Sequence, residues 1–315
     1  MKLSQIGERE IIRRLTSGSG VGELEDCAVL DFDDGQLLLS TDSVSYENNI
    51  PKGADPEMIG KFLASINLSD IAAMGGIPIG MLIALFLPKD TEFEFLEGVY
   101  RGIKMRLQEF DCKILGGDTK ESSTFSIAGT IVGKSGSGGV VRQSGISSGQ
   151  VIGITGSLGR AAAGKIFYEN GYRKSHGIRL MLDFMPRINE AIALARNGAK
   201  FMTDLSDGLY SSLWKIRDSS GLGARIVAED IPIHTAMEKA GELSSIDIIE
   251  TACNYGGDYE IMFTIENREY GDFRKKMAEE KIPVFFIGEV YDGDIIIYRN
   301  NEWKKVTDKG YEHFR

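Results

Sequence analysis

The stretch NLSDIAAMGGIPIGMLIALFLP, Asn67–Pro88, carries one charged side chain, Asp70, followed by eighteen uncharged residues. An uncharged run of this length just reaches the lower limit for a membrane-spanning helix. Three glycines and a proline interrupt it, however, and glycine weakens a helix while proline breaks one. We therefore predict a buried helix that ends near Met74, a turn at Gly75–Pro78 and a buried strand over GMLIALFLP. Asp70 would then lie close to the core, where a carboxylate requires a cation or hydrogen-bond donors.

The composition is that of a globular protein, with 315 residues, of which 42% are hydrophobic and 26% charged. This length suffices for one large or two ordinary domains. Three widely spaced cysteines exclude a CxxC metal site, and no apolar segment typical of a secretion signal precedes the charged residues 8–10, so we expect a cytoplasmic protein. The net charge of −10 argues against a nucleic-acid partner, and we expect no membrane partner either. An acidic enzyme can still bind phosphates through a divalent metal ion.

Strand-like and helix-like segments alternate along the chain. The predicted strands of the first half are Gln36–Val44, Gly80–Leu87, Lys113–Thr119 and Phe125–Lys134, and the predicted helices are Pro56–Met74 and Glu92–Phe110. The Gly/Ser-rich segment Ser135–Gln150 then indicates a domain boundary. A strand over VIGITG and a helix from about Leu158 restart the pattern. We therefore predict an α/β (α+β) fold with two domains, residues 1–145 and 146–315.

Six aspartates share one setting, a short polar break beside an apolar run. They are Asp26, Asp42, Asp70, Asp118, Asp204 and Asp207. Such breaks at strand ends are where α/β folds bind ligands. Carboxylates brought together would take up protons unless metal ions neutralise them, and oxygen ligands with few His or Cys favour Mg²⁺ or Ca²⁺ over zinc. Taken singly, each aspartate could equally be a helix cap or a turn residue, and spacing does not show that all six converge.

The segment GRAAAGKI, Gly159–Ile166, fits a P-loop except at its last position, where Ile166 replaces the residue that reaches magnesium. Its glycines equally suit a strand–turn–helix connection, so we predict no P-loop. Arg142, in the Gly/Ser-rich VVRQSG, is a candidate clamp for a polyphosphate. There is no GxSxG, and acids flanking Cys27 would raise the pKa of its thiol. If the chain is an enzyme, positioning and metal ions are the expected means of catalysis.

Eight short motifs follow one another along the chain: EDCAVL, STD, NLSDIAAMGG, LGGDT, RQSG, DLSDGL, GGDYEIMFT and KGYEHF. Taken together and in this order, they resemble the motifs of the thiamine-monophosphate kinase family. This family belongs to a superfamily with aminoimidazole-ribonucleotide synthetase, selenophosphate synthetase and the hydrogenase maturation factor that forms a nitrile. The resemblance covers nearly the whole chain, and NLSDIAAMG together with the ending GYEHF favours the kinase branch.

The resemblance implies an N-terminal ATP-binding domain whose strands form a barrel across a homodimer interface, and a second α/β domain with a mixed sheet flanked by helices. It also implies ATP and several Mg²⁺ ions in the cleft, and transfer of the γ-phosphoryl group to thiamine monophosphate, giving thiamine diphosphate and ADP. The implied metal ligands are Asp26, Ser40, Thr41, Asp42, Asp70, Asp118, Asp204 and Asp207. The implied ATP contacts are Tyr100, Gly117, Asp118, Arg142 and Ser206, and the implied catalytic residues are Asp42, Asp118 and Asp207.

Departures from the family pattern fall where the acceptor would bind. Asn49 stands in the place of a histidine, Gly257 in the place of a glutamate, and Lys309 in the place of an aromatic residue. With Tyr311, Asn49 and Gly257 are the candidate acceptor contacts. Two alternatives follow. The chain could be a related ATP-dependent enzyme that acts on another phosphorylated or carboxylated acceptor, or a non-catalytic ATP-binding assembly protein.

Overall fold

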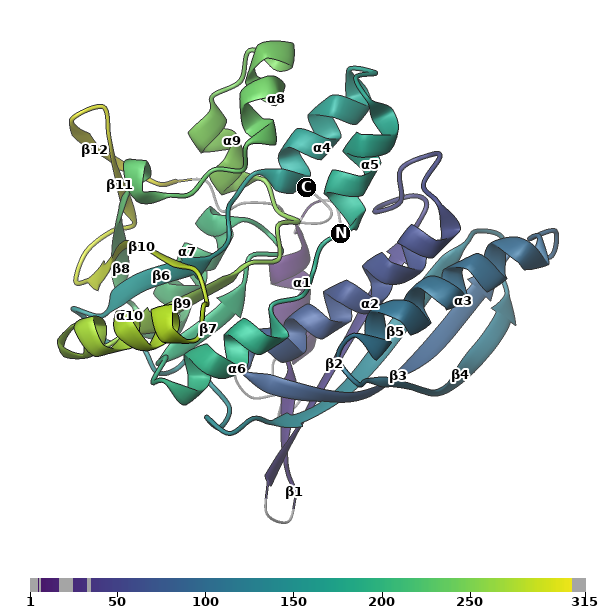
Figure 1. The fold of residues 1–315 in the computed structure, drawn as a ribbon, viewed down its shortest axis with the longest axis horizontal. Coiled ribbons are helices and arrows are strands. Elements are labelled where there is room, and N and C mark those ends of the chain that lie inside the picture. The colour runs from purple at the N-terminus through teal and green to yellow at the C-terminus, as the bar shows by residue number, and fades with distance from the viewer. Residues whose placement is uncertain (1–4, 6, 17–24, 33–34, 308–315) are drawn as a thin grey trace.

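The chain forms two β-sheets with helices around and between them (Figure 1). The computed structural model describes Gln5 and residues 7–16, 25–32 and 35–307 of the 315-residue chain. The first half contains α1 (Gly7–Thr16), β1 (Ala28–Phe32), β2 (Gly35–Ser45), α2 (Pro56–Ala73), β3 (Gly76–Leu87), α3 (Phe93–Gln108), β4 (Lys113–Glu121) and β5 (Ser126–Ser135). The second half contains β6 (Val151–Thr155), α4 (Arg160–Glu169), α5 (Lys174–Leu182), α6 (Ile188–Arg196), β7 (Phe201–Asp204), α7 (Leu209–Ser220), β8 (Gly223–Val227), α8 (Ala236–Ser244), α9 (Ile248–Asn254), β9 (Ile261–Ile265), α10 (Tyr270–Glu279), β10 (Val284–Tyr291), β11 (Ile296–Arg299) and β12 (Glu302–Lys305).

The first sheet has five strands in the order β1-β2-β5-β3-β4. Its neighbouring strands are antiparallel except for β3 and β4, which run parallel and are connected by α3. Helices α2 and α3 lie on one face of this sheet (Figure 1). Buried and less buried residues alternate along β5, as expected for a sheet with helices on one face only.

The stretch Asn67–Pro88 contains the inner end of α2 and the whole of β3, as its pattern predicts. The predicted turn between them is too long, because β3 already begins at Gly76. One left-handed residue, Gly75 with φ 68°, makes the reversal, and Pro78 lies inside the strand. Strand β4 pairs with β3 only from Gly80 onward. Around Pro78, β3 is therefore an edge strand on that side, a position in which proline is tolerated.

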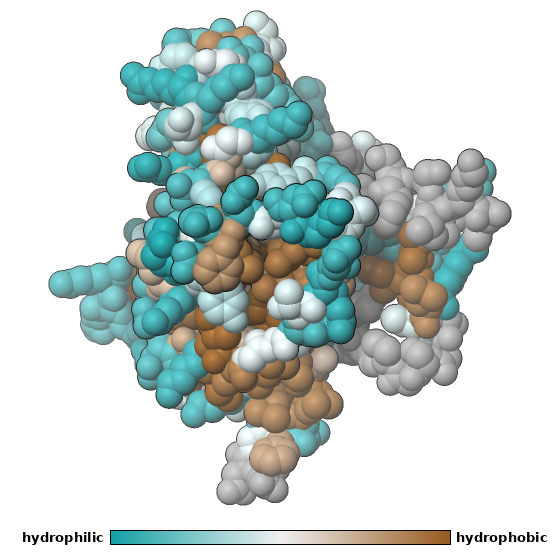
Figure 2. Space-filling view, turned by 90° about the vertical axis from the view of Figure 1, so that its right-hand side faces the viewer, coloured by the Kyte–Doolittle hydropathy of each residue, from teal (hydrophilic) through white to brown (hydrophobic). Residues whose placement is uncertain are grey.

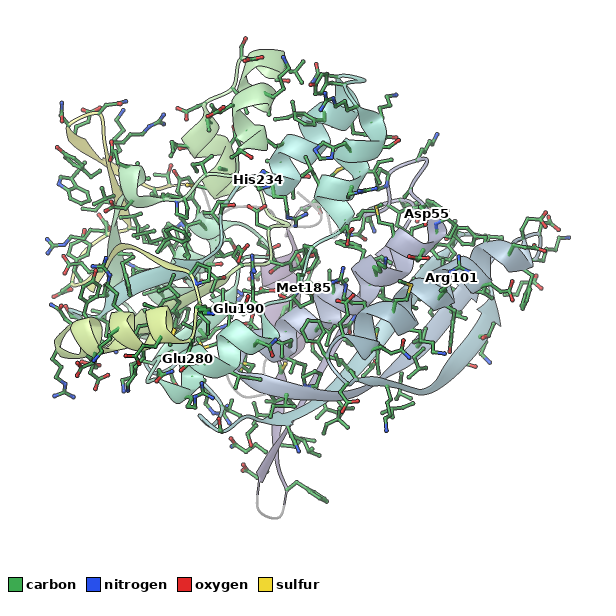
Figure 3. The ribbon with its side chains drawn as sticks, viewed as in Figure 1. Asp55, Arg101, Met185, Glu190, His234 and Glu280 are labelled. Carbon is green, nitrogen blue, oxygen red and sulfur yellow. The ribbon has the colours of Figure 1, made fainter. Side chains whose placement is uncertain are left out.

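Helix α2 runs from the edge of the molecule to its centre (Figure 1). Asp55, labelled at the outer end in Figure 3, caps the helix by accepting a hydrogen bond from the Glu57 backbone N–H at 2.9 Å. Helix α3 crosses α2 at two glycines. A Cβ on Gly60 would lie 1.9 Å from the Val99 carbonyl oxygen, and one on Gly102 1.9 Å from the Glu57 carbonyl oxygen. This close crossing fixes the direction in which α2 enters the molecule.

The second sheet has seven strands in the order β12-β11-β8-β10-β6-β9-β7. It is mixed, since β8 and β11 are parallel while the other neighbours are antiparallel. Strand β9 is buried on both faces: Phe263 packs in one apolar cluster with Phe273 of α10, and Met262 packs in another with Leu209 of α7. Helices therefore flank both faces of this sheet, as predicted.

The apolar core does not stop at the junction between the two sheets. The cluster that contains Leu63 of α2 also contains Leu194 of α6 and Phe263 of β9. Figure 3 labels Met185 and Glu190 in this central region, and Arg106 of α3 donates to the Met185 sulfur at 3.0 Å. The two halves of the chain are thus packed against each other over an apolar surface.

The prediction of a mixed α/β fold with two sheets is confirmed, but the first sheet is open in the single chain, with β1 and β4 at its edges. The described residues of a single chain form no closed barrel. Within that part of the chain, no helix is long and apolar enough to cross a membrane, which agrees with the interpretation of Asn67–Pro88.

Candidate active site

A cleft of about 1100 Å³ lies where the two halves of the chain meet. Its walls include β2 and the inner part of α2 from the first half, and α4, α9, the segment after β7 and the segment before β9 from the second. Six of the predicted site residues line it: Asp42, Asn49, Asp70, Ser206, Asp207 and Gly257. The structure therefore brings predicted metal and acceptor positions to one cavity.

Asp42 and Asp70 form the centre of the acidic wall. The Asp42 carboxyl lies within hydrogen-bonding distance of the Asp70 carboxyl, and Ser40 donates a short hydrogen bond to Asp70. Burial, and then the Asp42 charge, hold the pKa of Asp70 well above its usual range. Burial likewise raises the pKa of Asp42, with Asp207 and Asp26 adding to the effect. Two neighbouring carboxyls with raised pKa values are stabilised in their charged form by a bound cation.

Asp204 is the last residue of β7 and accepts hydrogen bonds from both halves of the chain. Ser69 of α2 donates to one carboxylate oxygen at 2.7 Å, and Ser206 donates to the other at 2.8 Å. Burial, followed by the Asp26 charge, raises the pKa of Asp204 to about 6. Ser206, a predicted ATP contact, therefore also orients a predicted metal ligand.

Asp26 has a cationic partner that sequence reasoning missed. The Lys215 ammonium of α7 lies 2.9 Å from one oxygen of Asp26 and donates to the Thr203 hydroxyl at 2.8 Å. Gln143 donates to the second Asp26 oxygen at 3.5 Å, and its backbone N–H donates to Glu25. Burial alone would lower the pKa of Lys215, but Asp26, with Asp204 next, raises it overall. No local pattern marks this lysine in the sequence.

Tyr259 is a second residue that the sequence did not single out, although it lies in the motif GGDYE. It lines the cleft, its φ is 54°, and its ring stacks on Phe184 with centroids 4.2 Å apart and planes 2° apart. Burial, followed by Asp42 and Asp204, holds the pKa of its phenol well above the usual range. A bulky residue in the left-handed region requires firm support, and such residues concentrate at functional sites.

The neighbours of Tyr259 supply that support. Asp258 accepts from the backbone N–H groups of Gly159 at 2.6 Å and Ala161 at 3.1 Å, so its carboxylate caps α4. This carboxylate takes the place that a P-loop would offer to a phosphate, which supports the decision against a P-loop. Glu260 pairs with Arg187 through two contacts of 2.7 Å.

Several predicted residues lie apart from the acidic wall. Thr41 points to the opposite face of β2 from Asp42 and bonds to Gly129 and Thr130 of β5. Asp118 lies on the edge strand β4, where its nearest cation is Lys120 at 3.6 Å.

The other predicted nucleotide contacts are also spread over the first half. Tyr100 is exposed on α3, and Gly117 packs closely against the backbone of Ile83. Arg142 is half-buried and directly precedes Gln143, the partner of Glu25. At the acceptor end, the candidate contact Tyr311 and the departure Lys309 lie outside the described residues.

The cleft residues fit a divalent cation to different degrees. Asp42, Asp70 and Asp207 offer carboxylate oxygens to the cavity, the donors that Mg²⁺ prefers. In residues 25–32 and 35–307, however, no three acidic, His or Cys side chains already surround a common metal position. Asp26 and Asp204 have their oxygens taken up by protein donors. The cleft therefore offers carboxylate ligands from Asp42 and Asp70 of the first half and from Asp207 of the second, without a closed protein cage.

Two family models match the chain in tandem. The N-terminal domain of AIR synthase related proteins matches residues 24–135, and the C-terminal domain matches residues 147–299. The two ranges cover most of the chain, and each contains the strands of one sheet up to β11. The chain thus has the N-terminal and C-terminal domains of the AIR synthase related proteins.

Several proteins that are similar to this chain over its whole length are thiamine-monophosphate kinases. A thiamine-monophosphate kinase of Pyrococcus horikoshii is 30% identical over 99% of this chain and 98% of its own length. One of Methanospirillum hungatei is 33% identical over 96% of this chain and 97% of its own length. The solved structure described as AaThiL complexed with AMPPCP and TMP has a TM-score of 0.88 and 26% identity, and the match covers 99% of both chains. The chain therefore belongs to the thiamine-monophosphate kinase family.

Proposed function

We propose that this chain transfers the γ-phosphoryl group of ATP to the phosphate of thiamine monophosphate, giving ADP and thiamine diphosphate. The observation that carries the proposal is the acidic cleft between the two halves, where Asp42, Asp70 and Asp207 line one cavity with the predicted acceptor positions Asn49 and Gly257. Similarity over the whole length to proteins of that name supports it.

The chemistry fits the residues of the cleft. An acceptor phosphate oxygen forms a bond to the γ-phosphorus while the bond from that phosphorus to the β–γ bridging oxygen breaks, and ADP leaves. Because the acceptor phosphate is already ionised near pH 7, the step needs no general base. It needs in-line alignment and neutralisation of negative charge, and Mg²⁺ supplies the latter when bound. Asp42, Asp70 and Asp207 are the residues that would hold it.

The acceptor end of the cavity has its own character in this chain. Gly257 has φ 90°, a conformation that a glutamate would adopt only with strain, and its Cβ position would lie 3.0 Å from the Ala161 Cβ. Tyr259 and Lys165 also line the cavity, and Asn49 adds an amide. These groups support recognition of the acceptor by hydrogen bonding and stacking in place of a carboxylate at position 257.

We also infer that the chain acts as a homodimer through the open face of the first sheet. Figure 2 shows apolar side chains gathered in the middle and lower part of the face it presents. The exposed apolar residues of β1, β3 and β4 are Leu30, Phe32, Ile79, Leu82, Phe86 and Leu115. Strand register puts Thr41 and Asp118 on this same face. A second copy packed there would bring both side chains to a shared interface.

The remaining parts of the proposal concern organisation and compartment. We assign residues 1–145 to the ATP-binding and dimerisation domain and residues 146–315 to the domain that completes the cleft. Cys27, Cys112 and Cys253 are all free thiols, which supports a reducing, cytoplasmic setting.

The test is incubation of the purified chain with ATP, Mg²⁺ and thiamine monophosphate, with the products identified by mass. Thiamine diphosphate and ADP in equal amounts are the expected result, with a reaction without acceptor as the control. ADP formed only with another phosphorylated or carboxylated acceptor would replace the substrate while keeping the reaction class. Nucleotide binding without ADP release under a broad acceptor panel would instead favour a non-catalytic assembly protein.

A further inference from the structure

The acidic cluster contains a cation of its own. Lys215 sits in the second turn of α7, the helix that follows the DLSDG segment directly. Its Nζ atom lies 2.9 Å from Asp26 and 2.8 Å from the Thr203 hydroxyl, and the Asp26 side chain is only 9% exposed. This ammonium therefore connects the segment before β1 to β7 of the second half.

The contacts of Asp26 leave little room for a divalent ion. One carboxylate oxygen faces Lys215, and the other faces the Gln143 amide at 3.5 Å. A magnesium ion at Asp26 would lie at contact distance from the ammonium, and the two positive charges would repel each other strongly in this partly buried position. Asp42 and Asp70 differ, since their partners are a hydroxyl and each other.

We propose that the Lys215 ammonium is a permanent cation of the active site, which neutralises Asp26 and removes it from the set of divalent-metal ligands. Lys215 is then a positioning residue: it fixes Asp26 and Thr203 beside Asp204, and it replaces one metal ion in the charge balance of the cluster. The inference rests on the proposed function only in requiring that the cleft binds a metal–nucleotide complex.

The experiment counts bound Mn²⁺ by electron paramagnetic resonance, with a non-hydrolysable ATP analogue present and thiamine monophosphate absent. Wild type is compared with Asp26→Asn, Lys215→Met and the double variant, each first checked for folding by its melting curve. We expect Asp26→Asn to bind as many ions per chain as wild type. Lys215→Met should gain one ion per chain because Asp26 becomes available, and the double variant should lose that gain.

Two results would overturn the inference. Loss of one ion in Asp26→Asn would make Asp26 a metal ligand, and an unchanged count in folded Lys215→Met would reduce Lys215 to a structural ion pair. If the variants do not fold, wild-type crystals with Mn²⁺ and the analogue decide: an anomalous peak at Asp26 contradicts the inference, and a retained ammonium contact without a peak supports it.

The outcome is separable from that of the proposed function. A different acceptor would leave all Mn²⁺ counts unchanged, since no acceptor is present in the experiment. A wild-type chain that binds no Mn²⁺ with the nucleotide analogue would overturn the premise that both proposals share.

Discussion

At the scale of single residues, the acids of the cleft are placed by neutral donors and one cation. Ser40 donates a hydrogen bond to Asp70, while Ser69 and Ser206 donate hydrogen bonds to Asp204. Hydroxyl donors orient a carboxylate without cancelling its charge, so Asp70 remains able to bind a cation and Asp204 adds negative charge beside it. Without a metal ion, the repulsion among these carboxylates lowers the stability of the folded chain, and a bound metal ion raises it. This is expected of a site that binds a charged ligand.

Asp42→Asn tests the role of the carboxylate nearest to Asp70. We expect turnover to fall by at least about 100-fold, because an amide is a weaker ligand for Mg²⁺ and the phosphates lose their alignment. The melting temperature in the absence of metal should not fall, since one of two repelling charges is removed. Steady-state kinetics and a thermal melt provide both measurements.

Asp218→Asn, on the exposed end of α7, is the matched control for loss of one carboxylate. It should keep full activity. Near-normal turnover in a well-folded Asp42→Asn variant would contradict the assignment of Asp42 to the reaction.

The pH dependence of stability tests Asp204. Burial raises its pKa from 3.8 to about 6, so the folded chain binds this proton more tightly than the unfolded chain does. Its contribution to stability is complete below about pH 4 and is lost as pH rises through the folded pKa. In EDTA, the melting temperature of wild type minus that of Asp204→Asn should therefore decrease between pH 4 and pH 7.

Added Mg²⁺ should reduce this decrease, because it compensates the ionised cluster. A difference that stays constant with pH in EDTA would show that Asp204 titrates alike in the folded and unfolded chains.

At the scale of elements, α2 is the part on which the site depends most. It carries Ser69 and Asp70 on its inner end, and its position follows from the glycine crossing with α3 and from the Asp55 cap. An element that is buried along almost its whole length tolerates few changes in its neighbours.

Gly102→Ala should destabilise the chain by about 1–3 kcal/mol, because the new Cβ would lie 1.9 Å from the Glu57 carbonyl and force the helices apart. Chemical denaturation measures the loss. Gly271→Ala in the first turn of α10 is the matched control, since no atom lies within 4 Å of its Cβ position. That variant should be neutral or slightly stabilising through helix propensity. Equal effects of the two substitutions would argue against a tight crossing.

At the scale of the whole molecule, the single chain leaves a sheet face uncovered. Leu82 is 43% and Leu115 54% exposed there, and both lie on neighbouring strands. Apolar residues gathered on one face of a sheet are typical of an interaction surface. The proposed homodimer would cover them.

The double variant Leu82→Glu, Leu115→Glu should convert a dimer into a monomer, because charges buried in the interface would remain unpaired. Light scattering coupled to size exclusion measures the mass, with twice the chain mass expected for wild type. Leu15→Glu on α1, which lies outside this sheet, is the control for added charge and should remain dimeric. A wild-type chain that is monomeric at micromolar concentration would contradict the interface.

The sequence by itself determined the order of the elements from β2 to β5, whereas α1, β1 and most elements after α4 were not predicted individually. The strand-like segment Phe125–Lys134 and the glycine and proline interruptions of Asn67–Pro88 are local patterns, and they predicted strands and helices close to the observed ones. The motif order identified the family, and the setting of the six aspartates beside apolar runs pointed to metal-dependent chemistry. The length of the turn before β3 was missed, because one glycine suffices where a four-residue turn was expected.

Only the tertiary structure decided which acids meet. Strand pleating turns Thr41 away from Asp42, and sheet order puts Asp118 on the far edge strand, which spacing along the chain does not reveal. The Lys215–Asp26 pair joins residues 189 positions apart, and the left-handed Tyr259 depends on the cap and ion pair that flank it. Such contacts form between distant segments when the two halves pack together, so the sequence holds no local trace of them.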